Sequence, residues 1–208
     1  MSTTVEITVP TAGAYQVYNA KNKVVPSQAI SKNKILVAVN EPGLTYSVYT
    51  LRKVNSRVRV IGAKACDKFE NSTYAVTFDG CGDICSIVDK RSGKELVAKG
   101  KSIGLRIFKN NLSEKWPAWE IRKNVIDQEP TKVCYDVKIE LVEDGPVRKT
   151  VRVSKKYGRS VFEQYISIYE GVNSGRIDIR NEVEWATQDA LLKADFPLSF
   201  SASKARYD

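Results

Sequence analysis

Two tryptophans and a carboxylate lie close together in the stretch SEKWPAWEI, residues 113–121. Trp116 and Trp119 are three residues apart, and Glu120 follows directly. Aromatic rings stack on the apolar faces of pyranose rings, and a carboxylate accepts hydrogen bonds from sugar hydroxyls. These three residues are therefore the candidate sugar-facing residues. The alternative is an ordinary core or cross-strand pair, because tryptophan buries a large apolar area wherever it can.

Pro117 decides which conformation this stretch can adopt. Proline lacks a backbone donor and restricts the residue before it to extended conformations, which favours a loop leading into a strand. A strand that begins at Ala118 would place Trp119 and Ile121 on one face and Glu120 on the other. The pattern predicts Trp119 in the core and Trp116 on the loop.

The absence of histidine excludes many kinds of catalytic site from this chain. None of the 208 residues is histidine, so a His-containing zinc site, a Ser-His or Cys-His nucleophile pair and an imidazole acid-base group are all ruled out. We therefore assign no catalytic residue, no metal ligand and no cofactor to this chain.

The four cysteines match no redox or zinc spacing. Cys81 and Cys85 are four residues apart, and Cys66 and Cys134 are isolated, which fits neither a CxxC pair nor two zinc knuckles. Reduced, partly buried thiols are expected. A Cys81–Cys85 disulfide requires a turn that brings the two Cα atoms within about 7 Å.

Alternating apolar residues predict an all-β chain. Residues 176–185 and 133–141 read as long half-buried strands, with Ile177, Ile179, Val183 and Trp185 on one face of the first. Shorter strands are expected at 73–78, 84–88, 104–108, 148–153 and 161–169, and only 186–192 could form a turn or two of helix. The predicted architecture is a large antiparallel β-sandwich, truncated and of the supersandwich kind.

A small β-module should precede the sandwich. Short strands separated by Gly, Pro and Asn fill the first part of the chain, and longer strands follow a boundary within residues 53–62. We divide the chain into a small β-module, residues 1–58, and the N-terminal part of the large sandwich domain, residues 59–208.

The basic excess is concentrated in the predicted small module. The chain carries 33 Lys and Arg against 24 Asp and Glu, and residues 1–60 alone hold eight basic and two acidic residues. The basic residues occur as scattered couples, which indicates a solvated face and no nucleic-acid partner. No apolar run approaches the roughly 20 residues that cross a bilayer. The N-terminus has no signal-peptide pattern, so no membrane partner is expected, and the compartment is left open.

The stretch from Lys68 to Leu96 carries a distinctive series of residues: Glu70, Asn71, Gly82, Ile84, Ser86, Ile87, Asp89, Lys90, Gly93 and Glu95. This series resembles the start of the C-terminal β-sandwich of the α-mannosidases of glycoside hydrolase family 38. PAWEI resembles an Asp-Ala-Trp-Asp/Glu element of that domain, with Pro117 in place of the aspartate. ALLKADFPL, residues 190–198, resembles a Leu-Leu-Lys-x-x-Phe-Pro element, and VVPSQ and GLTYSVYTL resemble the preceding small module.

The resemblance implies a non-catalytic segment of a zinc-dependent retaining α-mannosidase. In that family the zinc site and the nucleophilic aspartate belong to an N-terminal α/β domain, which nothing in this chain matches. The implied partners are the catalytic domain of the same polypeptide and a mannose-containing carbohydrate. The alternatives are a stand-alone carbohydrate-binding β-sandwich module, which uses similar aromatic platforms, and an interaction domain without a ligand.

Overall fold

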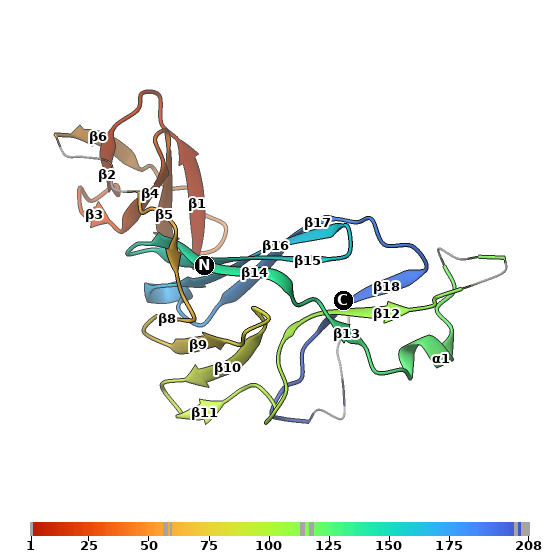
Figure 1. Cartoon of the computed structure of the whole chain (residues 1–208). Helices are drawn as coiled ribbons and strands as arrows, with labels where there is room; N and C mark the ends of the chain where they lie inside the picture. The colour runs from red at the N-terminus through yellow and green to blue at the C-terminus, as the bar shows by residue number, and fades with distance from the viewer. Residues whose placement is uncertain are drawn as a thin grey trace.

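The described strands form five antiparallel sheets (Figure 1). We keep the name small module for the two sheets that precede residue 55, and the name sandwich for the three that follow. The structure, a computed structural model, describes residues 2–55, 58, 60–112, 115–116, 119–201 and 204. Within these residues the only α-helix is the single turn α1, Lys123–Ile126, and one 3₁₀ turn spans Gly171–Asn173. No helix of the described residues is long and apolar enough to span a membrane. The all-β prediction is confirmed.

The small module consists of two three-stranded antiparallel sheets, β1-β5-β4 and β3-β2-β6. Its strands are β1 (Ser2–Thr8), β2 (Ala14–Tyr18), β3 (Val24–Val25), β4 (Ser27–Ser31), β5 (Lys34–Asn40) and β6 (Thr50–Val54). Val9, Val17, Ile35 and Val37 form its own buried core. This core is separate from that of the sandwich because the alternating apolar residues of β5 face β2 and not the following strands.

The main layer of the sandwich is a five-stranded antiparallel sheet in the order β17-β16-β15-β14-β7. The strands are β7 (Lys64–Ala65), β14 (Tyr135–Asp144), β15 (Arg148–Tyr157), β16 (Ser160–Tyr169) and β17 (Ile177–Glu184). Val151 pairs with Ile166, and Ile166 pairs with Ile179. Apolar side chains therefore fill one face of this sheet, and polar side chains cover the other.

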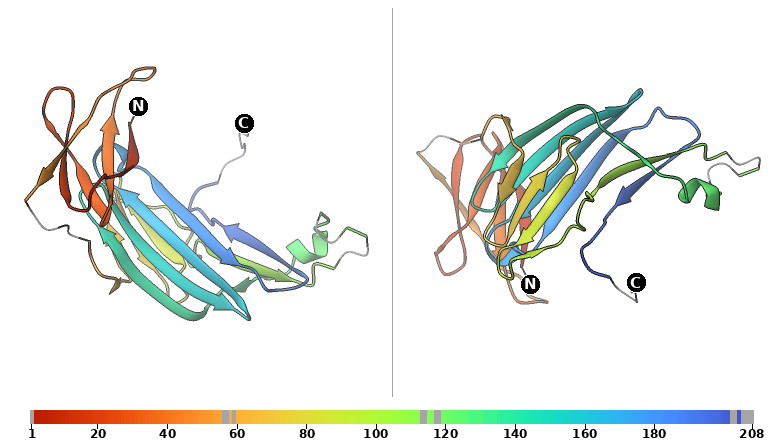
Figure 2. Two further views of the ribbon diagram at one scale, coloured as in Figure 1. Left: turned by 90° about the horizontal axis from the view of Figure 1, so that it is seen from above. Right: turned by 60° about the horizontal axis from the view of Figure 1, so that its bottom comes forward.

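Two smaller sheets cover the apolar face (Figure 2). The first, β11-β10-β9-β8, contains β8 (Lys68–Glu70), β9 (Tyr74–Phe78), β10 (Ile84–Asp89) and β11 (Lys94–Glu95). The second, β13-β12-β18, contains β12 (Gly104–Lys109), β13 (Thr131–Lys132) and β18 (Ala190–Asp195). An isolated bridge between Ile84 and Ile103 connects the two.

The structure differs from two sequence interpretations of this layer structure. The stretch 186–192 was the one place where a turn or two of helix could form, but its residues 190–192 begin β18, because β12 offers a complete ladder from Lys109–Ala190 to Gly104–Asp195. In β14 a β-bulge between Tyr135 and Lys138 shifts the register. It leaves Tyr135 72% exposed and not on the inner face with Ile139.

The side chain of Gln28 connects the small module to the sandwich. Its Oε1 accepts hydrogen bonds from the backbone N–H groups of Val147 and Arg148, at 2.9 and 2.8 Å, and its Nε2 donates to the carbonyl of Arg148 at 3.0 Å. Gly145 lies against this amide, where a Cβ would collide with Gln28 Oε1. The amide thus docks the module on the β14–β15 hairpin.

Candidate functional site

The connection between β12 and β13 carries the two candidate tryptophans. In Figure 1 it projects beyond the sheets together with α1. Asn110, with φ of 58°, turns the chain out of β12, and the Asn111 N–H donates to the carbonyl of Asp189 at 2.9 Å. At the other end Gln128 Nε2 donates to the carbonyl of Lys109 at 2.9 Å. The base of the projection is therefore fixed to the β12–β18 pair.

Trp116 and Trp119 stack on each other at the tip. Their ring centroids are 5.5 Å apart with an interplanar angle of 28°, a favourable offset geometry. The carbonyl of Trp116 accepts hydrogen bonds from the N–H groups of Trp119 and Glu120, at 3.0 and 2.9 Å. This tight turn holds the rings together and places Glu120 beside them.

The predicted division between a core and a loop tryptophan is wrong. Trp119 is 81% exposed and Trp116 is 55% exposed. Residues 119–122 form a turn and extended coil instead of a strand, while Pro117 and Ala118 lie outside the described residues. Among the described residues, no strand pairs with residues 119–122, and α1, which begins directly afterwards, buries only Val125.

The tryptophan pair is part of a larger exposed apolar surface. Leu112, Ile121 and Ile126 are 56%, 50% and 44% exposed on the same connection. Solvated single apolar residues are ordinary, but a group of five on one projection is typical of an interaction site. The candidate residues Trp116, Trp119 and Glu120 are therefore all accessible to a ligand or a partner domain.

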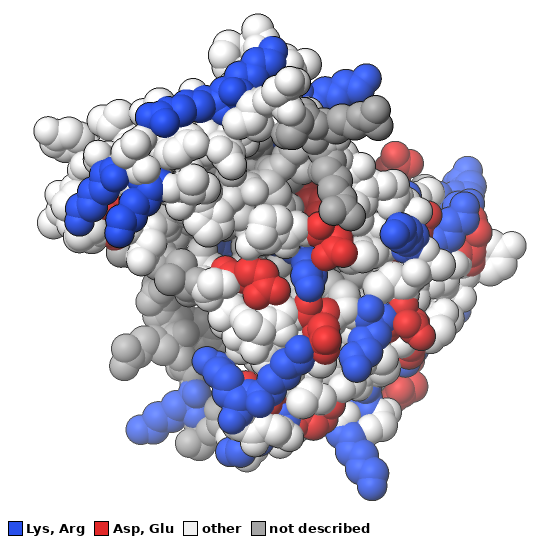
Figure 3. Space-filling model, turned by 90° about the vertical axis from the view of Figure 1, so that its left-hand side faces the viewer, with Lys and Arg blue, Asp and Glu red and all other residues white. Residues whose placement is uncertain are grey.

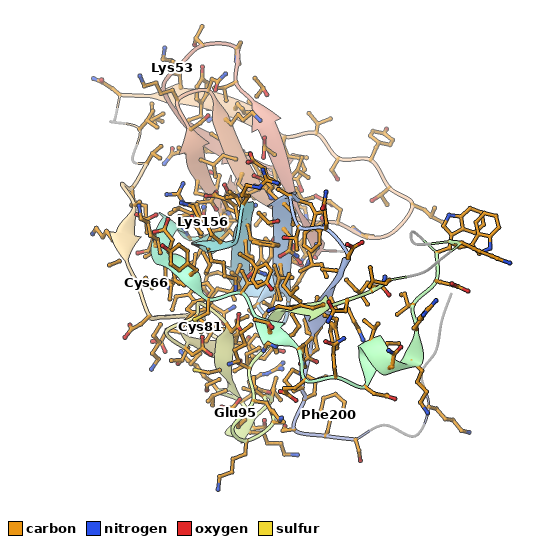
Figure 4. All side chains as sticks on the ribbon, turned by 45° about the vertical axis from the view of Figure 1, so that its right-hand side comes forward. Lys53, Cys66, Cys81, Glu95, Lys156 and Phe200 are labelled. Carbon is orange, nitrogen blue, oxygen red and sulfur yellow. A yellow bond between two sulfur atoms is a disulfide. The ribbon has the colours of Figure 1, made fainter. Side chains whose placement is uncertain are left out.

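The cysteines pair differently from either sequence alternative. Cys81 and Cys134 form a disulfide with a Cα–Cα distance of 4.6 Å, while Cys66 and Cys85 are free thiols. The disulfide joins the β9–β10 turn to the start of β14, near the middle of the sandwich where Figure 4 labels Cys81. A separation of 53 residues gives no local spacing signal, so the sequence could not reveal this pairing.

A buried group of charges lies next to this disulfide. Asp83 Oδ2 accepts a hydrogen bond from Arg106 Nη1 at 2.6 Å, and Asp83 Oδ1 accepts one from Lys155 Nζ at 2.7 Å. Burial lowers the pKa of Lys155 although Asp83 opposes the shift. Gly104 admits the Asp83 carboxylate, which a Cβ at that position would displace. The group connects the β9–β10 turn to β12 and β15, and all three side chains are almost fully buried, so we regard it as structural.

The residues of the first family motif also stabilise the fold. Asn71 is 4% exposed, donates to the carbonyls of Tyr169 and Ser174 and accepts from the N–H groups of Thr73 and Tyr74. Glycosylation of this Asn-Ser-Thr sequon would break that network. Lys90 Nζ donates to the Asn71 carbonyl at 2.8 Å and pairs with Glu70 at 3.0 Å. These motif residues hold two loops of the sandwich together.

Glu95 performs the same role in the β10–β11 hairpin. Its carboxylate accepts hydrogen bonds from Ser86 Oγ at 2.6 Å and from the N–H groups of Ile87 and Val97 at 2.9 and 2.8 Å. Gly93, with φ of 67°, makes the preceding turn. Across the described residues no three His, Cys, Asp or Glu side chains form a group able to hold a metal ion.

The antiparallel sheets and their apolar cores define an all-β domain of the β-sandwich class. The family model described as Glycosyl hydrolases family 38 C-terminal domain matches residues 69–208, and the chain therefore belongs to this family. It is also similar to Alpha-mannosidase G of Dictyostelium discoideum, with 26% identity over 145 residues. That match covers 67% of this chain and 13% of the relative, so the chain spans a small part of the length of that protein.

Proposed function

We propose that this chain is a non-catalytic segment of a zinc-dependent retaining α-mannosidase and that it supports the catalytic domain of the same polypeptide. The family match over residues 69–208 carries this proposal. The name of the relative, an α-mannosidase, supports mannosides as the substrate class. The zinc and the pair of carboxyls about 5 Å apart that a retaining glycosidase requires would both belong to the catalytic domain, as the family resemblance implies.

The projection that carries Trp116 and Trp119 is the part of this chain proposed to line the sugar site. The stacked rings form an exposed apolar surface, and the backbone of Glu120 is hydrogen-bonded to the carbonyl of Trp116 in the same turn. Functional residues concentrate on loops that a rigid scaffold positions. The disulfide and the β12–β18 pairing supply such a scaffold.

Activity measurements on two forms of the protein test this proposal. The isolated 208-residue chain should fold but should not hydrolyse an aryl α-mannoside, with or without added zinc. In the full-length enzyme, Trp119→Ala should lower kcat/KM roughly 10-fold, because a lost aromatic contact of about 1.4 kcal/mol corresponds to that factor. Tyr135→Ala, which removes another exposed aromatic residue, serves as the matched control.

Stability measurements separate a ligand-contacting role from a packing role. Trp116→Ala and Trp119→Ala should each change the free energy of unfolding of the isolated chain by less than about 0.5 kcal/mol, as exposed substitutions usually do. Zinc-dependent hydrolysis by the isolated chain would disprove the proposed division of labour. Wild-type turnover by both tryptophan variants would show that this loop does not line the sugar site.

A further inference from the structure

The outward face of the five-stranded sheet contains a groove of about 410 Å³ that crosses β14 to β17. Residues of β1 and β4 close one side, so the groove lies where the small module meets the sandwich. Its volume falls within the range of about 300 to 1,000 Å³ that is usual for small-molecule sites. None of its residues belongs to the tryptophan projection.

The floor of the groove is polar but shielded. Thr150, Ser167 and Tyr169 point to the outward face, yet they are only 4%, 7% and 5% exposed. On a sheet face that simply contacts water, such residues are exposed. Thr150 Oγ1 and Ser167 Oγ are 2.9 Å apart, and Tyr169 Oη donates to Asp178 Oδ2 at 2.6 Å. This end of the face is therefore a recess, unlike the open polar surface beside it.

Two carboxylates are held rigidly at the floor. Glu143 accepts hydrogen bonds from Arg148 Nε at 2.6 Å and Nη2 at 2.8 Å, and from Thr150 Oγ1 at 2.8 Å. Asp178 accepts from Tyr169 Oη at 2.6 Å and from Arg176 Nε at 2.6 Å. A carboxylate offers about four acceptor positions, so both retain capacity for hydroxyl donors of a ligand. Asp178 is half-buried, with its side chain 33% exposed.

Tyr165 and Arg180 form a flat wall of the groove. The Arg180 guanidinium lies 4.4 Å from the centroid of the Tyr165 ring, a stacked arrangement that presents N–H donors beside an aromatic surface. Planar polar groups combined with an aromatic face are suited to a ring that carries several hydroxyls.

The charges in the groove balance. The carboxylates of Glu143 and Asp178 are offset by the guanidinium groups of Arg148 and Arg180, and Glu6 at the rim pairs with Lys34 at 2.6 Å. A net field that would select an anion or a cation is absent among these described residues. We propose that this groove binds a neutral saccharide unit, at a second site separate from the tryptophan loop. Only the choice of a mannoside as probe rests on the proposed function.

Titration of the ¹⁵N-labelled 208-residue chain with methyl α-D-mannopyranoside, followed by NMR, tests this site. Amide shifts should move at the ends of β15, β16 and β17 that line the groove, at millimolar ligand. Arg180→Gln and Ser167→Ala should each weaken binding at least 5-fold. Arg91→Gln should not, although its side chain is 64% exposed, close to the 66% of Arg180. Melting curves establish that each variant is folded. If only one of the two groove variants folds, that variant alone is a sufficient test.

Each other outcome has a defined meaning. Binding that is lost in Trp119→Ala but kept in both groove variants would assign the saccharide to the loop, which overturns this inference and leaves the proposed function intact. Citrate or phosphate that shifts the groove amides more strongly than the mannoside would make it an anion site. No shift with the mannoside, with methyl α-D-glucopyranoside or with a mannotriose would also overturn it.

Discussion

Glu95 stabilises one hairpin through three hydrogen bonds to its carboxylate. The contribution of these bonds to the stability of the fold should depend on pH. Partial burial raises the pKa of Glu95, but the hydrogen bonds from Ser86, Val97 and Ile87 outweigh that effect, so the pKa lies below the ordinary value of 4.5. A carboxyl whose pKa is lowered on folding contributes stability above its unfolded pKa. That stability is lost as the pH falls through the folded value.

The substitution Glu95→Gln should therefore lower the melting temperature at pH 7. It should also make the melting temperature fall less steeply as the pH is lowered. A decrease of a few degrees is expected, because 1 kcal/mol corresponds to about 2–4 °C in a chain of this size. The wild-type and variant curves should approach each other as the pH falls below about 4.5. Glu6→Gln, which removes an exposed ion-pair partner, is the control, and an equal pH dependence of all three proteins would contradict this explanation.

Trp119 illustrates the limit of local sequence rules for single residues. The rule that a strand alternates its faces is sound, but it applies only if a strand exists, and Trp119 lies in a turn before α1. Exposure of a large aromatic residue depends on what lies beside it in space. The sequence could predict the chemistry of Trp116, Trp119 and Glu120 as a group, but not the position of each side chain.

Among the structural elements, the β9–β10 turn and the start of β14 depend on the Cys81–Cys134 disulfide. Closing a loop of 53 residues should stabilise the fold by about 4 kcal/mol in the chain-entropy description. The double substitution Cys81→Ser and Cys134→Ser should therefore lower the free energy of unfolding by about 3 to 4 kcal/mol in urea titrations.

The free thiols provide the matched control for the disulfide. Cys66→Ser together with Cys85→Ser should cost less than about 1 kcal/mol, since both side chains are partly exposed. A reducing agent should destabilise the wild type and this control to the same extent, and it should leave the Cys81/Cys134 variant unchanged. A Cys81/Cys134 variant as stable as the oxidised wild type would show that the bond does not constrain the unfolded chain.

Strand positions were predictable wherever apolar alternation was long. The expected strands at 73–78, 84–88, 104–108 and 161–169 agree with β9, β10, β12 and β16 to within one residue at each end. The bulge in β14 and the identity of β18 were not predictable, because both depend on the neighbouring strand. A register shift and a ladder partner are properties of a pair of segments and leave little trace in either one.

For the whole molecule, the division between module and sandwich remains a prediction that limited proteolysis can test. The structure has β6 ending at Val54 and β7 starting at Lys64, and the family match begins at residue 69. Trypsin should cut first between Lys53 and Lys64, as connections between modules are accessible. Initial cleavage within 70–109 would contradict this boundary.

The large-scale charge pattern was accessible from composition, but its arrangement was not. Basic side chains dominate the upper part of the face in Figure 3, over the small module, while both signs mix below it. Figure 4 places Lys53 at the far end of the module and Glu95 at the opposite end of the molecule. The sequence indicated that the basic excess lies in the N-terminal part of the chain. The groove with its balanced charges forms only when β1 and β4 approach the five-stranded sheet.

The contact that Gln28 makes suggests how the small module could be attached to another protein. Its amide satisfies the hairpin backbone as another strand would, with an acceptor for two N–H groups and a donor for one carbonyl. A receiving hairpin would have to offer in its turn the same three backbone groups, of which the carbonyl also accepts from the Gly145 N–H at 3.2 Å, and a residue without a Cβ at the position of Gly145. A designer could therefore attach this module to an unrelated β-hairpin by supplying that turn, and lengthening the turn would release it.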